Sequence, residues 1–502
     1  PLGLGPVHAD LISAGVRIMN NSWGGLYWND PTVTNQIAQE YRPFILSNNG
    51  LVVFASGNES RSQPSDTAAL PSQPGPNGTL PAADLERGWL VVGAVDTANP
   101  TQLASYSNAC GVAMRYCLVA PGTSLFIDPD ATAGNIRYFY GSGTSFAAPL
   151  VSGAAALVWQ AFPYFNNDLV RQTLLGTATD LGAAGVDPVF GYGLLNVGKA
   201  VLGPARFDWG TVDVNVTTLR STWANDISGT GGLTKRGTGT LVLSSTANTF
   251  AGDTQVLAGT LQTASLQSAR VSIANGASLV GAGRIGGQVD NAGTLQVNGA
   301  TASITGNYTQ ASNGRLAVNV GDRLNVAGTA TIAGDLQLLG RRDYVVNNTT
   351  YPVLQATSGL QGTFDTLSSG PAVTFLTATR SYDANTAYIS LQRMDVTAVA
   401  ASLGAIGTAS MDSAMRVEQA FQKVDAQQFQ GNGALGGDFI RAAAALQQSP
   451  TAKAAADSLR SLSGRAHAAS AAMTFDTIDL GRRALASHFD GLSQQPRLLG
   501  SW

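Results

Sequence analysis

Residues 141–162 read GSGTSFAAPLVSGAAALVWQAF, the most specific segment of the chain. Glycines lead up to Ser145, and a long run of small and apolar residues follows it. Such a run predicts a helix that is buried on all sides. A serine in the first turn of that helix lies at the positive end of the helix dipole, which favours the developing negative charge of an attacking alkoxide.

The residues around Ser145 suit a nucleophile. Gly143 lets backbone and substrate approach closely, Thr144 can brace the turn, and Ala147 and Ala148 keep the helix thin enough to lie in a core. The alternative is an ordinary serine N-cap, which occurs at many helices. The apolar run is much longer than a cap requires, so the sequence favours the nucleophile.

Length and composition limit the class of protein. A chain of 502 residues is longer than a domain with one hydrophobic core usually is, so two or three domains are expected. The 29 Lys and Arg residues nearly balance 32 Asp and Glu, and charged residues make up only 12% of the chain. Nucleic acid is not an expected partner, because it requires a basic surface. No run of 18 apolar residues occurs, so no transmembrane helix is predicted.

Two cysteines, Cys110 and Cys117, occur in the chain. A small loop can close this spacing as one disulfide, which would indicate an oxidising compartment. Two buried free thiols in a cytosolic protein are the alternative.

From residue 1 to 205 the pattern predicts an α/β domain with a parallel sheet between helices. The expected strands are 17–22, 51–58, 89–96 and 117–122. Residues 34–50 have helical spacing, with Gly50 as the expected C-terminal cap. The Pro-rich stretch 63–83 is expected to be a long surface excursion.

Residues 206–394 contain a leucine repeat that predicts a parallel β-helix. The leucines follow one another at intervals of about one coil, at which inward side chains of successive coils stack. They are Leu241, Leu261, Leu279, Leu295, Leu316 and Leu336. A β-sandwich of hairpins is the alternative, but its turns would come every 8 to 12 residues.

Residues 395–502 are predicted to be a helical tail. Ala, Gln, Arg and Met with helical spacing predict helices at 411–424, 439–448 and 452–462. The final residues lack the alternating strands of a barrel.

The segment GTSFAAPLVSGAAAL resembles the serine motif of the subtilisin family, in which the serine matching Ser145 is the nucleophile. Two upstream segments agree in the same order. Met19–Gly25 resembles the strand beside the substrate pocket, and Val52–Ser60 resembles the oxyanion segment. The resemblance implies a serine endopeptidase that cleaves protein or peptide substrates on a subtilisin-like parallel sheet with helices on both faces.

The resemblance also implies the site residues. Ser145 would attack the scissile carbonyl, and the side-chain amide of Asn58 would bind the oxyanion together with the Ser145 N–H. Trp23 could equally belong to the core. Contacts to an extended peptide are expected from Ser22, Trp23, Gly24, Ser56, Gly57, Gly143 and Thr144.

The catalytic Asp and His of the family are not evident. Upstream of the segments matched above, where the family has them, neither an Asp-x-Gly motif nor a His-Gly-Thr motif occurs. His8 lacks the following Gly-Thr and is interpreted as an incidental helical residue that Asp10 cannot orient, while His467 and His488 lie in the helical tail. Either the Asp and His precede this chain or a pseudoprotease has lost them; a start at Pro1 without a leader favours the first interpretation.

Later segments resemble bacterial autotransporters. Gly231–Gln262 is similar to the passenger-associated repeat, and Tyr351–Leu367 looks like closing rungs of such passengers. The fold implied is a right-handed parallel β-helix, followed by a helical linker to an outer-membrane translocation barrel that is missing here. Export through the periplasm and outer membrane of a Gram-negative bacterium is therefore expected, to the medium or the cell surface.

No cofactor is expected, because acyl-enzyme chemistry needs no metal or organic group. Calcium often steadies loops in this family, but no compact acidic cluster is evident. A non-catalytic adhesin or passenger is the competing interpretation. A carbohydrate-active β-helix would need paired carboxylates, whereas the acids here are scattered: Asp253, Asp290, Asp322 and Asp335.

Overall fold

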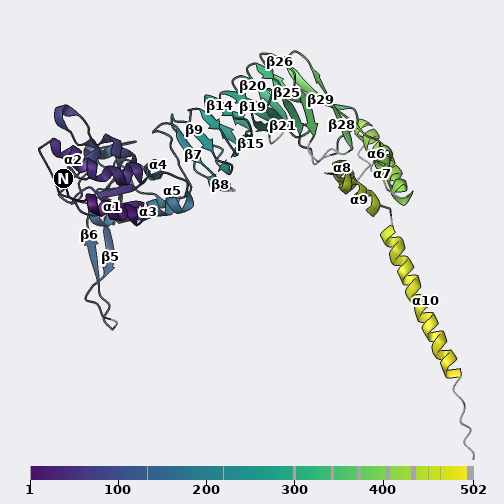
Figure 1. Ribbon diagram of the computed structural model, residues 1–502, viewed down its shortest axis with the longest axis horizontal. Coiled ribbons are helices and arrows are strands. Elements are labelled where there is room, and N and C mark those ends of the chain that lie inside the picture. Colours follow the sequence, from purple (N-terminus) through teal and green to yellow (C-terminus); the bar gives the residue numbers. More distant parts are fainter. Residues whose placement is uncertain are drawn as a thin grey trace, which may run out of the picture. The chain divides into compact units, whose positions relative to one another are not determined.

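A computed structural model provides the structure of the protein (Figure 1). It describes residues 2–493 apart from 133, 219, 298–300, 341–343, 370–374, 403–407, 431–436, 450 and 464. The chain forms two compact units, Pro1–Gly314 and Arg315–Trp502.

The first unit begins with a parallel four-stranded sheet in the order β1-β2-β3-β4. The strands are β1 (Ile18–Asn21), β2 (Leu51–Ala55), β3 (Trp89–Val95) and β4 (Cys117–Pro121). Every residue of β2 and β3 is buried, as expected for strands covered on both faces. The four predicted strands and the α/β class are confirmed.

Helices cover both faces of this sheet. Ile37 and Tyr41 of α2 pack in one core cluster with Val52, Phe54 and Trp89. Alternate side chains of a strand point to the opposite face, and the helix that carries Ser145, α3, contacts all four strands. The helices are α1 (Gly5–Ser13), α2 (Thr32–Arg42), α3 (Thr144–Ala161), α4 (Asn167–Thr177) and α5 (Val197–Ala200).

The prediction that α3 is buried on all sides is wrong. Ala147, Val151 and Ala155 are fully buried against the sheet, whereas Leu150 and Leu157 are 42% and 47% exposed. The sheet packs against one side of the helix, and the side that carries Leu150 and Leu157 remains partly exposed.

The prediction that Gly50 is the C-terminal cap of this helix is also wrong. Helix α2 ends at Arg42 and continues as a π-helical turn, Pro43–Ser47. Asn49 takes the left-handed conformation, with φ of 56°. Gly50 is required for space, because a Cβ there would lie 2.3 Å from the Phe44 ring.

The Pro-rich stretch 63–83 is only partly a surface excursion. Ala68 and Leu70 are fully buried, and the Trp89 indole donates to the Ala68 carbonyl at 2.8 Å. This stretch therefore fills the core beside Trp89, which sequence patterning missed. Two short helical turns lie in this stretch, η2 (Leu70–Ser72) and η3 (Pro76–Gly78). Two more follow it, η4 (Ala83–Gly88) before β3 and η5 (Gly111–Tyr116) before β4.

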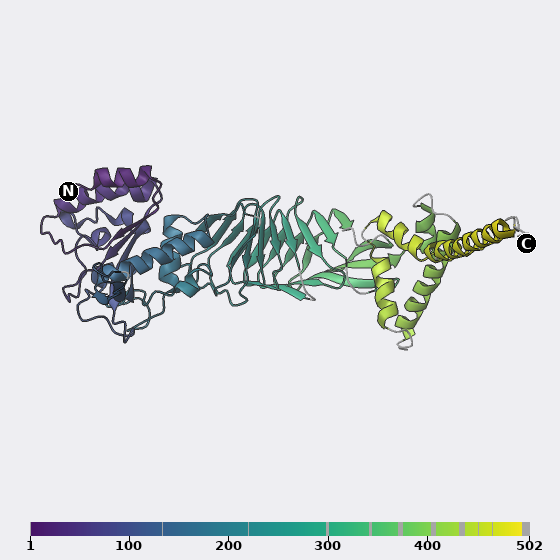
Figure 2. The same cartoon turned by 90° about the horizontal axis from the view of Figure 1, so that it is seen from below.

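The rest of the first unit is a stack of parallel coils, seen as rows of strands in Figure 2. Leucines oppose leucines: Leu241 pairs with Leu261, Leu261 with Leu279, and Leu279 with Leu295. All four are at most 1% exposed, so the predicted β-helix is confirmed. The strands are β7 (Val212–Asn215), β8 (Arg220–Trp223), β9 (Leu233–Arg236), β10 (Thr240–Leu243), β11 (Thr254–Val256), β12 (Thr260–Thr263), β13 (Ser265–Leu266), β14 (Arg270–Ile273), β15 (Ser278–Val280), β16 (Arg284–Ile285), β17 (Gln288–Asn291), β18 (Thr294–Gln296), β19 (Thr301–Ile304) and β20 (Tyr308–Gln310).

The second unit contains further coils. Leu316 pairs with Leu336, and Leu336 with Leu367, in parallel register. The last strands, β25, β29 and β28, pair antiparallel. The strands are β21 (Arg315–Val318), β22 (Arg323–Val326), β23 (Ala330–Ile332), β24 (Asp335–Leu338), β25 (Thr349–Ala356), β26 (Leu360–Gly362), β27 (Thr366–Ser369), β28 (Leu376–Tyr382) and β29 (Thr386–Arg393).

The chain then becomes helical, as predicted. The helices are α6 (Val396–Ser402), α7 (Thr408–Gln430), α8 (Gly437–Gln447), α9 (Ala452–Ser461) and α10 (Arg465–Ser493). Arg393 joins β29 to α7 through carboxylates of Glu418, at 2.6 Å, and Asp425, at 3.0 Å. Residues 494–502 of the predicted tail lie outside the described residues. Among those described, no helix combines the length and apolar character needed to cross a membrane.

Candidate active site

Ser145 is the second residue of α3, as the sequence predicts. The helix starts at Thr144, and its N-cap is Gly143 with φ 156° and ψ 159°, a conformation essentially restricted to glycine. The N–H groups of a first helical turn have no intrahelical acceptor. The backbone N–H of half-buried Ser145 is therefore available as a donor beside its own hydroxyl.

Asn58, three residues after the end of β2, is anchored to the start of α3. Its Oδ1 accepts from the Thr144 N–H at 2.8 Å and from the Thr144 hydroxyl at 3.0 Å. These two bonds use the carbonyl side of the amide and leave the Nδ2 group, which has no acceptor among the described residues. Asn58 is exposed, so its amide and the Ser145 N–H are two donors that an incoming oxygen can reach.

Thr144 and Gly57 hold these donors in place. Thr144 is fully buried, and its hydroxyl accepts from the Gly57 N–H at 3.3 Å. Gly57 has φ of 119°, and a Cβ there would lie 2.2 Å from Asn108 Nδ2. Thr144 thus braces the turn through its hydroxyl. Gly57 is required because a side chain there would clash with Asn108.

The segment after β1 forms the other side of the site. Ser22 Oγ donates to the Ser145 carbonyl at 2.8 Å. Trp23 packs edge-on against Phe54, with ring centroids 5.0 Å apart, yet remains 39% exposed. Trp23 is therefore partly a core residue and partly surface, and Gly24 next to it is exposed.

The position of Ser56 does not suit a contact with a bound peptide. It is fully buried, and its hydroxyl donates to the Asn108 carbonyl at 3.0 Å. Its N–H donates to Val92, and its carbonyl accepts from Ser65. This placement leaves no polar group of Ser56 for a bound peptide, because the chain behind the site uses all of them.

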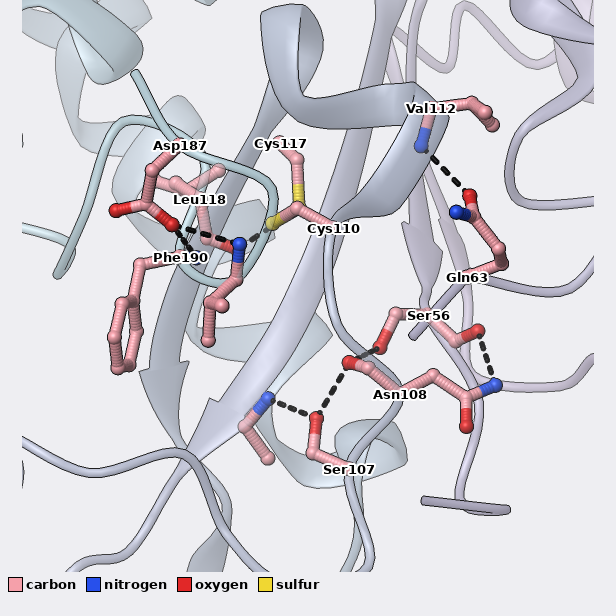
Figure 3. The surroundings of a disulfide bond; sticks show 12 residues. Ser56, Gln63, Ser107, Asn108, Cys110, Val112, Cys117, Leu118, Asp187 and Phe190 are labelled. Carbon is pink, nitrogen blue, oxygen red and sulfur yellow. Dashed lines mark hydrogen bonds between the residues drawn. A yellow bond between two sulfur atoms is a disulfide. The ribbon is translucent and has the colours of Figure 1, made fainter. Parts of the chain in front are cut away.

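Asn108 is a residue that sequence reasoning missed. Its Oδ1 accepts from the N–H groups of Glu59 and Arg61, at 3.0 Å each, and its Nδ2 donates to the Ser56 carbonyl at 3.2 Å. Figure 3 shows its side chain directed at Ser56. One amide thus holds the turn that carries Asn58. No local motif signals this role, because the contact spans about 50 residues of sequence.

Cys110 and Cys117 are joined by a disulfide with a Cα–Cα separation of 5.8 Å (Figure 3). Both are fully buried, and the chain has no free cysteine. Gly191 packs against the bond, since a Cβ there would lie 3.0 Å from Cys110 Sγ. The disulfide secures the segment that begins two residues after Asn108.

His8 packs away from Ser145. It is 3% exposed, its Nδ1 lies 2.7 Å from the Glu40 carbonyl oxygen, and its ring lies 4.6 Å from that of Tyr41. The interpretation of His8 as an incidental helical residue agrees with this placement. The side chains of His467 and His488 lie outside the described residues.

Metal-ligating side chains are not gathered anywhere in the described ranges. Within them, no group of three or more His, Cys, Asp or Glu residues is placed to hold a metal ion. Asp290 and Asp335 of the coils pair instead with Arg270 and Arg315.

Comparison with known families matches residues 8–193 to the Subtilase family, Peptidase S8. We call residues 8–193 the subtilase segment after this match. The match spans the sheet, Asn58, the disulfide and Ser145. Residues 233–263 match the passenger-associated-transport-repeat, which places this repeat on coils β9 to β12 after the subtilase segment.

Three curated relatives are similar to parts of this chain. The Neisserial autotransporter lipoprotein NalP of Neisseria meningitidis is 32% identical over 65% of this chain and 34% of its own length. An extracellular serine protease of Serratia marcescens is 29% identical over 69% of this chain and 39% of its own length. A subtilisin of Bacillus pumilus is 34% identical over 38% of this chain and 58% of its own length. The chain thus spans 34% and 39% of the lengths of the first two relatives.

Proposed function

We propose that the chain carries the nucleophile and oxyanion-binding half of a serine endopeptidase that acts outside the cell or on its surface. The arrangement of Asn58 supports this best. Its Oδ1 is held by the N–H and hydroxyl of Thr144, and its amide donor is left free beside Ser145. An aspartate could accept the same two hydrogen bonds but would offer no donor beside Ser145.

The proposed chemistry is acyl transfer. Ser145 Oγ attacks the scissile carbonyl and gives its proton to a base, while the oxyanion accepts hydrogen bonds from Asn58 Nδ2 and the Ser145 N–H. The base then protonates the leaving amine, and water hydrolyses the acyl-enzyme. The position of Asn58 at the start of α3 supports this scheme, and the proposed route needs no cofactor.

The base and its orienting carboxylate are proposed to lie outside these 502 residues. Two uncovered surfaces support this proposal. One edge of β1 has no strand partner in the described part of the chain, and α3 exposes Leu150 and Leu157 on the side away from the sheet. Further chain would cover both surfaces next to Ser145, and the 502 residues alone should hydrolyse peptides poorly.

Export through an autotransporter route is part of the proposal. The passenger-associated-transport-repeat at 233–263 supports it. So do the names of two relatives, an autotransporter lipoprotein and an extracellular serine protease. The protein would then reach the medium or cell surface of a Gram-negative bacterium, with protein or peptide substrates.

A fluorophosphonate probe on the full-length secreted protein tests the proposal. We expect labelling of the wild type and of Ser152→Ala, a control serine on the same helix, but none of Ser145→Ala. The isolated 502 residues should label far more slowly. Labelling that survives Ser145→Ala would contradict the nucleophile assignment.

An unlabelled wild type would instead favour the competing function, a non-catalytic passenger or adhesin. The gene sequence upstream of Pro1 gives a second test. We expect it to encode an export signal, an Asp-x-Gly motif and a His-Gly-Thr motif. Their absence would count against the enzyme.

A further inference from the structure

A two-stranded hairpin leads directly into the candidate active site. Strands β5 (Thr123–Ile127) and β6 (Tyr138–Ser142) pair antiparallel, and β6 is followed at once by Gly143. Figure 1 shows the hairpin standing out from the helices of the subtilase segment. Its position makes it a neighbour of any polypeptide bound at Ser145.

One face of the hairpin is attached to α3. The ring of Phe126 lies 5.0 Å from that of Phe146, on the first turn of α3, and 5.7 Å from that of Phe139. A Cβ on Gly141 would lie 2.6 Å from the Phe146 ring, so the strand passes closely over this aromatic group. These contacts fix the base of the hairpin relative to Ser145.

The opposite face is apolar and uncovered. Leu125 pairs with Tyr140, and Ile127 pairs with Tyr138, so strand alternation places all four side chains on one side. They are 55%, 76%, 62% and 60% exposed, respectively. A group of exposed large apolar side chains on one face marks an interaction surface. We call these four residues the hairpin face.

The hairpin face is within reach of a bound peptide. Tyr140 and Tyr138 precede Ser145 by five and seven residues, which limits their Cα distances from Ser145 to about 17 and 24 Å. An extended peptide advances about 3.3 Å per residue. Substrate residues up to about seven positions from the scissile bond can therefore contact the face.

The hairpin also offers backbone groups. In the two-stranded sheet β5-β6, each strand has one edge without a partner among the described residues. An extended peptide can add as a strand to such an edge, with alternate side chains contacting one face. Backbone pairing and the apolar face thus suit the same ligand.

We propose that the hairpin face binds large aliphatic or aromatic side chains of the polypeptide substrate, at alternate positions several residues from the scissile bond. This inference rests on the proposed function, and it adds a preference for long, apolar substrate segments. We assign the substrate as the ligand of the hairpin face because β6 leads through Ser142 and Gly143 directly to the nucleophile Ser145.

The test uses the full-length protein with the changes Leu125→Ser, Ile127→Ser and Tyr140→Ser combined. Leu80→Ser with Val112→Ser is the matched control, since both residues are about as exposed, at 53% and 52%. Three peptides are compared: a long one with Leu or Phe at alternate positions on both sides of the scissile bond, the same peptide with Ser at those positions, and a short one that cannot reach the hairpin.

We expect the hairpin variant to lose at least about tenfold in kcat/KM on the long apolar peptide. Its kcat/KM on the short and Ser-substituted peptides, and its rate of fluorophosphonate labelling, should match wild type. The control variant should match wild type throughout.

Equal kcat/KM of the variant and wild type on the long apolar peptide would overturn the inference. So would an equal loss on all three peptides, which indicates a structural role. If light scattering shows that the wild type is a dimer and the hairpin variant a monomer, a second copy of the chain covers the hairpin face. That result would also overturn the inference. An unlabelled wild type would contradict the proposed function itself, before any variant is compared, and the inference would fall with it.

Discussion

The subtilase segment and the coils are stabilised by contacts of different kinds. In the coils, the same contact recurs: Leu261 stacks between Leu241 and Leu279, and the next coil repeats the arrangement. At the candidate site, each contact occurs once, as between Asn58 and Thr144. Because the leucine contact recurs, the loss of one leucine should lower the free energy of unfolding only in part. A contact that occurs once, such as that between Asn58 and Thr144, has no neighbouring copy to replace it.

The largest expected effect comes from Asn58, whose contacts are unique. Asn58→Ala should lower the acylation rate of the full-length protein by about 10²–10³, a scale measured in subtilisin itself. Asn58→Asp keeps an acceptor for Thr144 but removes the amide donor. Fluorophosphonate labelling rates should fall in both variants. Near-normal labelling of Asn58→Asp would show that the residue only anchors the helix.

A core leucine of the coils should cost stability without affecting the site. Leu261→Ala creates a cavity and should lower the free energy of unfolding by about 3 kcal/mol. Leu279→Ala should cost a similar amount, because its surroundings are the same. Denaturant unfolding measures the loss, and labelling of Ser145 in the full-length protein should be unchanged. A much larger cost for one of these leucines would contradict the idea of equivalent coils.

Lys235 is an exception within the coils, since it makes unique contacts there. It is fully buried, and its Nζ donates to the carbonyls of Gly237, Gly239 and Ala258 at 2.7, 2.5 and 2.8 Å. Lys235→Met leaves three acceptors without this donor and should destabilise the protein by about 2 kcal/mol at pH 7.

Burial lowers the pKa of Lys235 from 10.5 to about 8. Between these values the unfolded chain binds more protons at this residue, so its contribution to the free energy of unfolding rises with pH. The stability gap between wild type and Lys235→Met should therefore widen between pH 8 and 10.5, by up to about 3 kcal/mol. Unfolding curves at several pH values measure it, and a constant gap would contradict the lowered pKa.

The smallest effect is expected from Asn108, which acts on the site through Asn58. Asn108→Ala removes the acceptor for the Glu59 and Arg61 N–H groups and should loosen the turn that carries Asn58. We expect about a tenfold slower labelling of Ser145, or about 1.4 kcal/mol. Combining it with Asn58→Ala should add little, since Asn108 positions the donor that is already removed. Fully additive losses would contradict this coupling.

Local patterning predicted much of this molecule. The four strands of the sheet, the leucine repeat of the coils and the position of Ser145 in the first turn of α3 follow from periodicity and composition. The misses share a cause. Gly50 and the buried stretch around Ala68 and Leu70 depend on which distant side chain lies against them, and patterning within one segment carries no such information.

The class of each part and the position of Ser145 can be predicted from the sequence, because strand alternation, coil repeats and a glycine-led apolar helix are local properties. The contacts that hold the site emerge only in the folded chain. Folding directs Asn58 Oδ1 to Thr144, ties its turn to Asn108 and exposes the hairpin face. These contacts join residues far apart in the chain, and their geometry exists only after the sheet and α3 have packed together.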